Sequence, residues 1–434
     1  MQQSVAHRGF VEETNGTFRV GRDIYTDPDL FETELARIFE GGWIYGCHES
    51  QIAGHGDYYA LRAGRQPVFL IRDGDGAING FIDACPHRGA LLTRARRGTM
   101  KTVTCRFHGW CFDTAGRCTR IKEEDRGWPD GLARDRFALA RVPRVENYRG
   151  FVFLSLSPHV PPLTEALGEA RRCVDLIAEQ SPDGMEVVPG SQSYMVRGNW
   201  KLQAENGVDG YHVSTVHRVF ARAVAMRESL GDTGGLRQTE AARITGTVAS
   251  GLCDLGGGHM MLWARRGNPK ATPLAEREDW LRHTHGEEVT DWMLRRGRNL
   301  FLFPNVLLMD QSSTQIRVVI PHAADLTEVR VYCIAPRGES PAARAARLRK
   351  FEDFFMVTGM ATPDDLAALE DVQRGAHGRL ARWNDMDRGA ADTIAGADRD
   401  LETLGVRPVT SSPDWGSEIA YHGFYRHWAE RLGS

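Results

Sequence analysis

The sequence predicts an α+β fold with two domains. Between residues 42 and 158, short apolar runs alternate with Gly, Asp and Pro turn signals, which is typical of a β domain. From residue 159 onward, helical patterns mix with strand-like runs, as in an antiparallel sheet flanked by helices. The chain has 434 residues, more than one ordinary core accommodates. We therefore expect a helical segment 1–41 that packs on the second domain, a β domain 42–158 and an α+β domain 159–434.

The sequence of the N-terminal segment predicts an extended stretch followed by a helix within residues 17–40. Asp27 suits the cap position and Pro28 suits the first helical turn. Leu30, Leu35 and Phe39 then form an apolar stripe. We expect this helix to lead directly into the β domain.

The β domain is predicted from a hairpin and a buried strand. Residues 68–71 and 77–82 are apolar and flank Asp-Gly-Asp-Gly at 73–76, a hairpin signature. Residues 151–154 predict another short buried strand. Pro158, Pro161 and Pro162 follow, and we place the domain boundary there.

The second domain opens with a predicted helix at 163–179. Residues 314–320 and 328–334 predict two strands separated by six or seven loop residues. Ser340-Pro341 opens a helix rich in Ala and Arg that should run to about Gly359. Thr362-Pro363 opens the next helix, with the Thr as its cap.

Composition narrows the class of protein. Lys+Arg number 54 and Asp+Glu 57, so the basic footprint of a nucleic-acid binder is missing. No apolar run has the length of a membrane span, and the N-terminus lacks the apolar stretch of a secretory signal. We expect a soluble, cytoplasmic bacterial protein. Its eight cysteines in a long chain favour metal binding over a disulfide scaffold.

Four of the Cys and His residues form the pattern C-x-H-x17-C-x2-H: Cys85, His87, Cys105 and His108. Two thiolates and two imidazoles suit zinc or a [2Fe–2S] cluster. A C2H2 zinc finger groups its cysteines in one loop and its histidines in another. Here each loop supplies one Cys and one His, which favours a Rieske cluster, where one iron takes two Cys and the other takes two His.

A second group of possible ligands follows at His212 and His217. Residues five apart lie about 140° apart around a helix, so the helix must end or bulge between them if both bind one ion. Asp364 or Asp365 would complete a 2-His-1-carboxylate triad for Fe(II). Two further interpretations stay open: solvated helix histidines, and carboxylates that only favour the helix N-terminus.

The two motifs, in this order, resemble the large subunit of Rieske non-heme iron ring-hydroxylating dioxygenases. The likeness is closest to the benzoate, toluate, 2-halobenzoate and anthranilate 1,2-dioxygenase branch and covers essentially the whole chain. It is carried by residues 24–49, 64–69, 198–217 (GNWKLQAENGVDGYHVSTVH), 303–311 and 359–366. Residues 383–386 (WNDM) and 388–389 (RG) also match.

The resemblance implies a role for each matching residue. Cys85 and Cys105 match the thiolate ligands of the cluster, and His87 and His108 match its imidazole ligands. The mononuclear iron would be bound by His212, His217 and Asp365. Asp209 matches the acid that links a cluster histidine of one subunit to an iron histidine of its neighbour. That bridge would fix the orientation of both imidazoles.

The resemblance also implies an activity. An NADH-dependent flavin/[2Fe–2S] reductase would feed electrons to the cluster and then to the iron, and both atoms of O2 would enter adjacent carbons of a benzoate-like ring to give a cis-diol. A small β subunit is implied, as α3β3 or else with α3 alone. The motifs also fit an anthranilate or 2-halobenzoate dioxygenase that yields catechol, a Rieske monooxygenase or demethylase, a Rieske ferredoxin and a structural zinc protein.

The sequence departs from the benzoate branch next to the iron motif. After His217 it reads Arg218-Val219-Phe220-Ala221-Arg222, and residues 226–258, with Gly234-Gly235, also differ. Arg218 and Arg222 are candidates for pairing with a substrate carboxylate, or they form a solvated helix face. By family analogy Phe355 and Ala361 line the pocket, although ordinary core packing would explain them equally well.

Six basic residues crowd the two cluster loops: Arg88, Arg94, Arg96, Arg97, Lys101 and Arg106. Such a rim would steer an acidic reductase domain toward the cluster. A pair of solvated loops would explain the same residues.

Overall fold

The computed structural model describes residues 9–14, 16–230, 248–311 and 313–433. The expected glycine pair at 234–235 lies outside these residues. Contacts divide the chain into two compact units, one made of residues 34–163 and the other of residues 1–33 and 164–434. None of the helices that the structure describes has both the length and the apolar character needed to cross a lipid bilayer.

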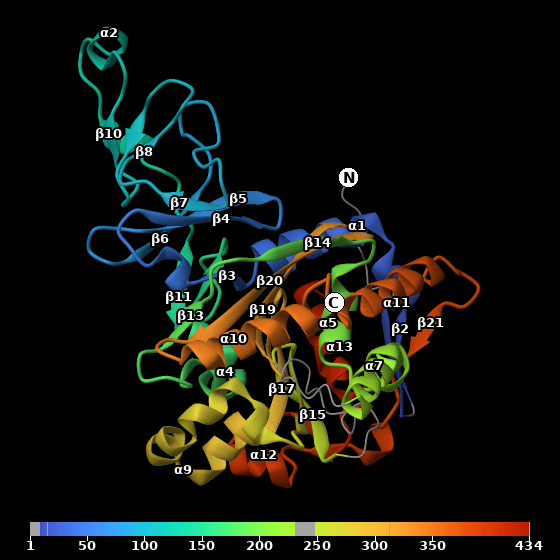
Figure 1. Cartoon of the computed structure of the whole chain (residues 1–434). Helices are drawn as coiled ribbons and strands as arrows, with labels where there is room; N and C mark the ends of the chain where they lie inside the picture. Colours follow the sequence, from blue (N-terminus) through green and yellow to red (C-terminus); the bar gives the residue numbers. More distant parts are fainter. Residues whose placement is uncertain (1–8, 15, 231–247, 312, 434) are drawn as a thin grey trace. The chain divides into compact units, whose positions relative to one another are not determined.

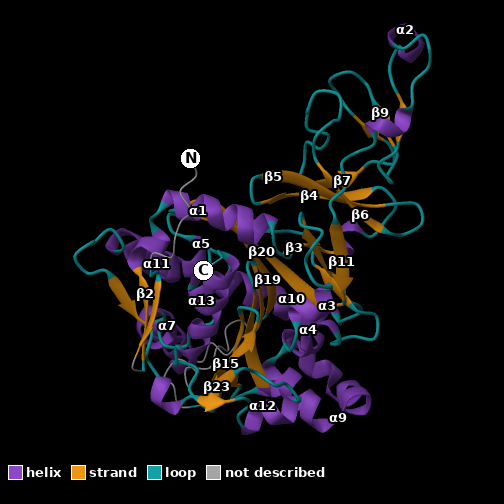
Figure 2. Ribbon diagram, turned by 180° about the vertical axis from the view of Figure 1, so that it is seen from behind, coloured by secondary structure: helices purple, strands orange, loops and turns teal. Residues whose placement is uncertain are grey.

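Residues 34–163, all of which are described, form three antiparallel sheets (Figure 2). Their strand orders are β6–β5–β4–β7, β11–β12–β3 and β10–β9–β8. The strands are β3 (Ile44–His48), β4 (Asp57–Ala63), β5 (Gln66–Arg72), β6 (Ile78–Ile82), β7 (Arg97–Thr99), β8 (Val103–Thr104), β9 (Cys111–Phe112), β10 (Cys118–Arg120), β11 (Arg144–Tyr148) and β12 (Phe151–Ser155). Helix α2 (Glu124–Gly127) is a single turn.

The expected hairpin is formed by β5 and β6, in which Val68 pairs with Ile82. Its turn is held locally, because Asp73 Oδ1 accepts the N–H groups of Asp75 and Ala77 at 3.0 and 2.9 Å. The expected buried strand at 151–154 is β12. Local turn chemistry and apolar runs therefore predicted these strands correctly.

The N-terminal helix begins where the sequence indicated. Asp27 Oδ1 accepts the N–H groups of Asp29 and Leu30 at 2.9 and 3.1 Å, and α1 (Pro28–Glu34) follows. The helix continues as a π-helical turn, Leu35–Glu40. Leu30, Leu35 and Phe39 are all buried, as their spacing predicts.

The unit of residues 1–33 and 164–434 is built around a large antiparallel sheet (Figure 1). Its order is β13–β20–β19–β18–β17–β16–β15–β23–β22, and β14 also pairs with β20. The strands are β13 (Met185–Val187), β14 (Gln192–Val196), β15 (Ser250–Gly256), β16 (His259–Arg265), β17 (Arg296–Leu302), β18 (Val306–Asp310), β19 (Thr314–Ala323), β20 (Leu326–Pro336), β22 (Ile394–Ala395) and β23 (Thr410–Ser412). A smaller sheet contains β1 (Val11–Thr14), β2 (Thr17–Gly21) and β21 (Trp383–Asp385).

The β19–β20 hairpin is longer than expected. The sequence predicted a loop of six or seven residues, but pairing continues through Pro321 and Thr327 to Ala323 and Leu326. The loop expectation is therefore wrong. Pro321 lacks an N–H group, but it is tolerated in β19 because it lies beyond Val318, the last residue of β19 that pairs with β18.

Helices cover both faces of the large sheet, as adjacent residues of β17 show. Arg298 Nη1 donates to the carbonyl of Trp292 in α9 (Glu278–Arg295), whereas Asn299 Nδ2 donates to the carbonyl of Gly207 in α5 (Trp200–Gly207) at 2.7 Å. Successive strand residues point to opposite faces. The α9 side also carries α4 (Ala170–Ala178), and α13 (Ile419–Arg431) packs on β15, β16 and β23.

The remaining α-helices described in this unit are α3 (Leu163–Leu167), α6 (Val213–Val216), α7 (Arg218–Ser229), α10 (Pro341–Lys350), α11 (Thr362–Gly375) and α12 (Arg399–Leu404). Ser340 caps α10 as predicted, since its Oγ accepts the N–H of Ala343 at 3.1 Å. The helical stretch ends with a π-helical turn, Phe351–Phe355, rather than near Gly359. The antiparallel sheet flanked by helices confirms the predicted fold class.

Candidate functional site

The two cluster loops have the same backbone design. In each loop the Cys N–H donates to a carbonyl five residues later, and its own carbonyl accepts from a glycine four residues later. The bonds are Cys85 to Ala90 (2.9 Å), Gly89 to Cys85 (2.8 Å), Cys105 to Trp110 (2.8 Å) and Gly109 to Cys105 (2.9 Å). Gly89 and Gly109 both have φ of 73°, which favours glycine. Two sequence-distant loops thus present Cys and His in matching positions.

The thiols of the two loops lie close to each other, and so do their imidazoles. Cys85 and Cys105 are buried, and their side chains are within hydrogen-bonding reach of each other. Burial raises the pKa of the Cys85 thiol to about 11, and the neighbouring Cys105 adds to this increase. The rings of His87 and His108 lie 4.6 Å apart between centroids. The two loops thus present one pair of sulfur donors and one pair of nitrogen donors.

The spacing of these donors fits a two-iron cluster better than one zinc ion. A tetrahedral zinc ion would hold all its donors within about 4 Å of one another. Cys85, His87, Cys105 and His108, all within the described part of the chain, contain no group of three donors that lie within 4.8 Å of one another. A [2Fe–2S] cluster separates its Cys pair from its His pair, as this geometry requires.

Two residues that sequence reasoning missed support the cluster loops. Trp110 stacks on the His87 ring at 4.7 Å between centroids with planes 5° apart. Asp83 is buried, and its Oδ1 accepts the N–H groups of Leu92 and Thr93 at 2.7 and 3.1 Å. The Asp83 carboxylate therefore fixes the backbone of the first loop, and the Trp110 ring holds the imidazole of His87. Asp83 lies two residues before the cluster ligand candidate Cys85, and this proximity in the sequence could have suggested its supporting role.

The second donor group forms where α5 gives way to α6. Helix α6 is one turn that fills the interval between the two histidines: His212 is its N-cap, and the helix ends at Val216 with His217 as its C-cap. The helix therefore ends before His217, as convergence on one ion requires. Their Nε2 atoms lie 3.3 Å apart. Gly210 makes the turn possible, because a Cβ there would lie 2.5 Å from the carbonyl oxygen of Trp415.

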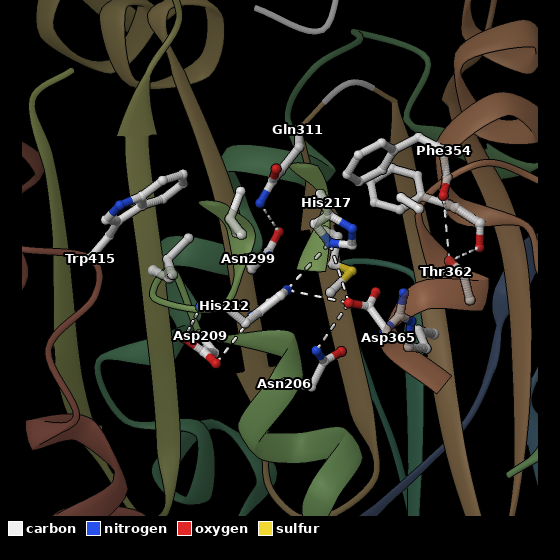
Figure 3. Close-up of a pocket in the computed structure, with 16 residues that line it drawn as sticks. Asn206, Asp209, His212, His217, Asn299, Gln311, Phe354, Thr362, Asp365 and Trp415 are labelled. Atoms are coloured by element: carbon white, nitrogen blue, oxygen red, sulfur yellow. Dashed lines mark hydrogen bonds and ion pairs between the residues drawn. The ribbon is translucent and has the colours of Figure 1, made fainter. Parts of the chain in front are cut away.

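Asp365 completes this group from α11 (Figure 3). Its Oδ1 lies 3.3 Å from His212 Nε2 and 3.2 Å from His217 Nε2. Thr362 is not the helix cap, which corrects the sequence expectation: its Oγ1 donates to the Phe355 carbonyl at 3.0 Å, and Ala361 occupies the cap position. The sequence does not show that the Thr362 hydroxyl finds an acceptor in the Phe355 carbonyl. This contact, rather than the local capping pattern, sets the position of the Thr362 side chain.

These three donors fit a mononuclear metal. Their ligand atoms all lie within 4.8 Å of one another. Donors at right angles and about 2.1 Å from an ion lie about 3 Å apart, close to the distances found here. Two imidazoles and one carboxylate on one side of an ion form the facial triad typical of non-heme Fe(II) enzymes.

The electrostatics of this group suit a cation. Burial lowers the pKa of His212, but Asp209 and Asp365 outweigh it and raise the pKa to about 10. Burial keeps the pKa of His217 below its usual value, which favours the neutral ring that a metal needs. Burial opposes ionisation of Asp365, yet His212 and His217 bring its pKa below the usual range. The three side chains therefore favour positive charge between them.

Asp209 holds His212 from the opposite side. Its Oδ1 accepts the N–H groups of Tyr211 and His212 at 2.6 and 3.3 Å. Its Oδ2 lies 3.1 Å from His212 Nδ1 (Figure 3). The carboxylate therefore shapes the turn and faces the ring nitrogen that points away from Asp365.

Helix α5 is anchored one turn before this site. The Glu205 carboxylate is half-buried and accepts hydrogen bonds from the hydroxyls of Tyr25, at 2.8 Å, and Tyr425. Burial raises the pKa of Glu205 to about 7, although the two tyrosines oppose this increase. The sequence had given no role to Glu205.

A pocket of about 720 Å³, counting its space open to solvent, adjoins the donor group. Its lining includes His212, His217 and Asp365 together with Phe355 and Ala361, the two pocket residues expected by analogy. Arg218 and Arg222 are exposed on α7 and are not among the lining residues. The lining residues that sequence reasoning missed include Asn206, Leu262, Asn299, Met309, Gln311, Arg317, Phe354 and Trp415.

The region 226–258 was also expected to shape the pocket. Residues 231–247 lie outside the described chain. The described remainder includes Gly256, Gly257 and Gly258, which have positive φ and connect β15 to β16. The strand β16 then brings Leu262 to the pocket lining.

The fold and the two donor groups define an iron–sulfur oxygenase with a Rieske domain and a mononuclear metal centre. The chain belongs to the ring hydroxylating alpha subunits, whose catalytic domain matches residues 185–434, and a Rieske [2Fe-2S] domain matches residues 42–146. The resemblance found in the sequence is thereby confirmed.

Three similar proteins match nearly the whole chain. Toluate 1,2-dioxygenase subunit alpha of Pseudomonas putida is 45% identical and is matched over 97% of this chain and 92% of that protein. The 2-halobenzoate 1,2-dioxygenase large subunit of Burkholderia cepacia is 42% identical, over 97% and 90%. Anthranilate 1,2-dioxygenase large subunit of Acinetobacter baylyi is 39% identical, over 95% and 88%.

Solved structures support the fold. A naphthalene 1,2-dioxygenase with indole in its active site matches with a TM-score of 0.84 over 96% of this chain and 92% of that chain, at 24% identity. This similarity shows the architecture, with its Rieske domain and its mixed helix and antiparallel-sheet domain.

Proposed function

We propose that the chain is the oxygenase α subunit of an enzyme that dihydroxylates an aromatic carboxylate at ring positions 1 and 2. The observation that carries this proposal is the triad of His212, His217 and Asp365 at the side of a pocket that aromatic side chains help to line. The three similar proteins are named for toluate, 2-halobenzoate and anthranilate, which are all aromatic carboxylates.

The proposed division of labour follows from the two donor groups. Cys85, His87, Cys105 and His108 would hold a [2Fe–2S] cluster, which would supply electrons. His212, His217 and Asp365 would hold Fe(II), which would supply O2 activation. Asp209 orients the His212 ring through Nδ1. Phe354 and Phe355 give the pocket an aromatic wall, which would exclude water from the face of the bound substrate ring.

A substrate panel tests this proposal. The purified α subunit, with its partners and NADH, is given benzoate, toluates, 2-halobenzoates, anthranilate and toluene under ¹⁸O2, and products and NADH use are measured. We expect two labelled oxygens in one product from at least one carboxylate. Exclusive turnover of toluene, or one labelled oxygen per product, would overturn the proposal.

The proposed enzyme has several components. The names of the similar proteins, "subunit alpha" and "large subunit", support a small β subunit, for which we propose α3β3. An NADH-dependent flavin/[2Fe–2S] reductase completes the electron supply.

We keep the domain limits 42–158 for the Rieske domain and 159–434 for the catalytic domain as part of this proposal, with segment 1–41 packed on the catalytic domain.

The reductase docks on the cluster face in this proposal. The six basic residues around the loops, Arg88, Arg94, Arg96, Arg97, Lys101 and Arg106, are all exposed. Leu91 and Phe107 are also exposed there, at 60% and 58%. An apolar patch with a basic rim suits an acidic redox partner.

Added salt is therefore expected to slow the reductase-supported reaction. We expect at least a tenfold loss of rate, roughly, between 20 and 500 mM NaCl, because screening weakens steering between charged partners. Arg106→Gln should raise the reductase concentration needed for half-maximal rate. The matched control Arg379→Gln, at an exposed site of the other unit, should not. A rate indifferent to salt, or equal effects of both variants, would contradict docking at this face.

A further inference from the structure

One buried cation in the pocket wall has no acidic partner. Arg317 lies on β19, is 4% exposed and is among the lining residues of the pocket. Among the residues that the structure describes, no carboxylate forms an ion pair with Arg317, and its Nε is buried without a hydrogen-bond partner. Guanidinium groups stay charged in proteins, and a buried charge without a partner is costly.

The sheet register explains why Arg317 faces the pocket. Leu262 pairs with Asn299, Asn299 pairs with Met309, and Met309 pairs with Gln315 on the neighbouring strand. Directly paired residues of an antiparallel sheet share a face, and so do residues two apart on one strand. Arg317 is two residues beyond Gln315, so it continues the row that contains the lining residues Leu262, Asn299 and Met309.

Formal charges in the pocket leave room for an anion. The ionised lining groups are Asp209, Asp365 and Arg317, with the two histidines neutral when they bind a metal. A divalent metal contributes two positive charges and the two carboxylates contribute two negative charges. The positive charge of Arg317 then remains uncompensated.

We propose that Arg317 binds the carboxylate of the aromatic substrate, an inference that rests on the proposed function. A carboxylate supplies the missing negative charge and can accept two parallel N–H bonds from the planar guanidinium. Arg317 and the metal ligand Asp365 line the same pocket, so the anchor faces the space beside the donor group. The carboxylate is attached to ring carbon 1, so this anchor holds carbons 1 and 2 toward the metal side of the pocket.

Arg317 takes the place of the two arginines that the sequence suggested for the carboxylate site. Arg218 and Arg222 are exposed on α7, where water already solvates their charge. Arg317 differs from both because it is buried and its Nε has no hydrogen-bond partner. Arg317 has no role predicted from the sequence, because residues 314–320 were interpreted only as a strand.

Arg317→Gln tests the assignment through binding and turnover. We expect the Kd for benzoate, measured by calorimetry on the holoenzyme, to rise about 100-fold, because a charge-assisted bidentate contact is lost. Binding of the neutral analogue benzamide should change less than about threefold. KM for benzoate should rise more than kcat falls. Iron and [2Fe–2S] content should stay at the wild-type level.

Two further variants complete the design. Arg317→Lys keeps the charge without the planar fork, so we expect about a tenfold rise in Kd for benzoate; it serves as the test if the Gln variant does not fold. Arg330→Gln is the matched control. Arg330 lies on the next strand and pairs with Glu328, and its cross-strand partner Val318 faces away from Arg317. This control should bind benzoate as the wild type does.

The outcomes separate this inference from the proposed function. If the wild type dihydroxylates a carboxylate but Arg317→Gln and Arg317→Lys bind benzoate normally, the role of Arg317 is refuted and the proposed function stands. Equal weakening of benzoate and benzamide would also refute it, because it indicates a packing role. If the wild type oxidises only uncharged arenes, the proposed function fails first.

Discussion

Asp365→Ala is expected to remove the mononuclear iron and abolish product formation while leaving the [2Fe–2S] cluster in place. Asp365 Oδ1 is the anionic donor that lies 3.3 and 3.2 Å from the two imidazole nitrogens. Without it, two neutral imidazoles remain to bind a divalent ion in competition with water. Iron should fall from about three to about two atoms per chain, with the visible absorption of the cluster unchanged.

The neighbouring carboxylate provides the control. Asp364 is half-buried in the same first turn of α11 and is absent from the donor group. Asp364→Ala should keep its iron and its activity within about threefold, because it loses only a favourable interaction with the helix N-terminus. Iron retained in Asp365→Ala, or lost equally in both variants, would contradict the ligand assignment.

The contrast between these two aspartates shows what sequence alone can decide. Spacing and residue types were sufficient to suggest a Rieske cluster on Cys85 and its partners, because donors in two short loops have few ways to meet. The choice between Asp364 and Asp365 needed either family resemblance or three-dimensional structure. Both residues favour a helix start, and only the direction of each side chain separates a ligand from a cap.

Local features of the fold were predicted better than long-range ones. The Asp73–Gly76 turn and the Asp27 cap depend on neighbouring backbone groups, so the sequence predicted both. Thr362 failed as a cap because its hydroxyl finds the carbonyl of Phe355, whose position depends on tertiary packing. The same limit applies to Arg317: the sheet face on which it lies follows from a register across four strands that no local pattern contains.

Asp209→Asn is expected to lower product formation about 100-fold with both metal sites still filled. The amide oxygen can still accept the N–H groups of Tyr211 and His212, so the turn before α6 should persist. The amide nitrogen cannot accept a hydrogen bond from His212 Nδ1, and it carries no negative charge. The substitution therefore isolates the interaction with the ring from the support of the backbone. Product yield, iron content and cluster absorption are measured on the same samples.

Comparison with Asp209→Ala decides which of the two roles matters. The alanine variant loses both the backbone bonds and the contact with the ring, whereas the asparagine variant loses only the latter. If Asp209 only shaped the turn, the asparagine variant would be active and the alanine variant inactive. We expect both to be inactive, with iron better retained in the asparagine variant because its turn keeps His212 facing His217 and Asp365. An active asparagine variant would reduce Asp209 to a structural residue and would remove the link to His212 on which its bridging role depends.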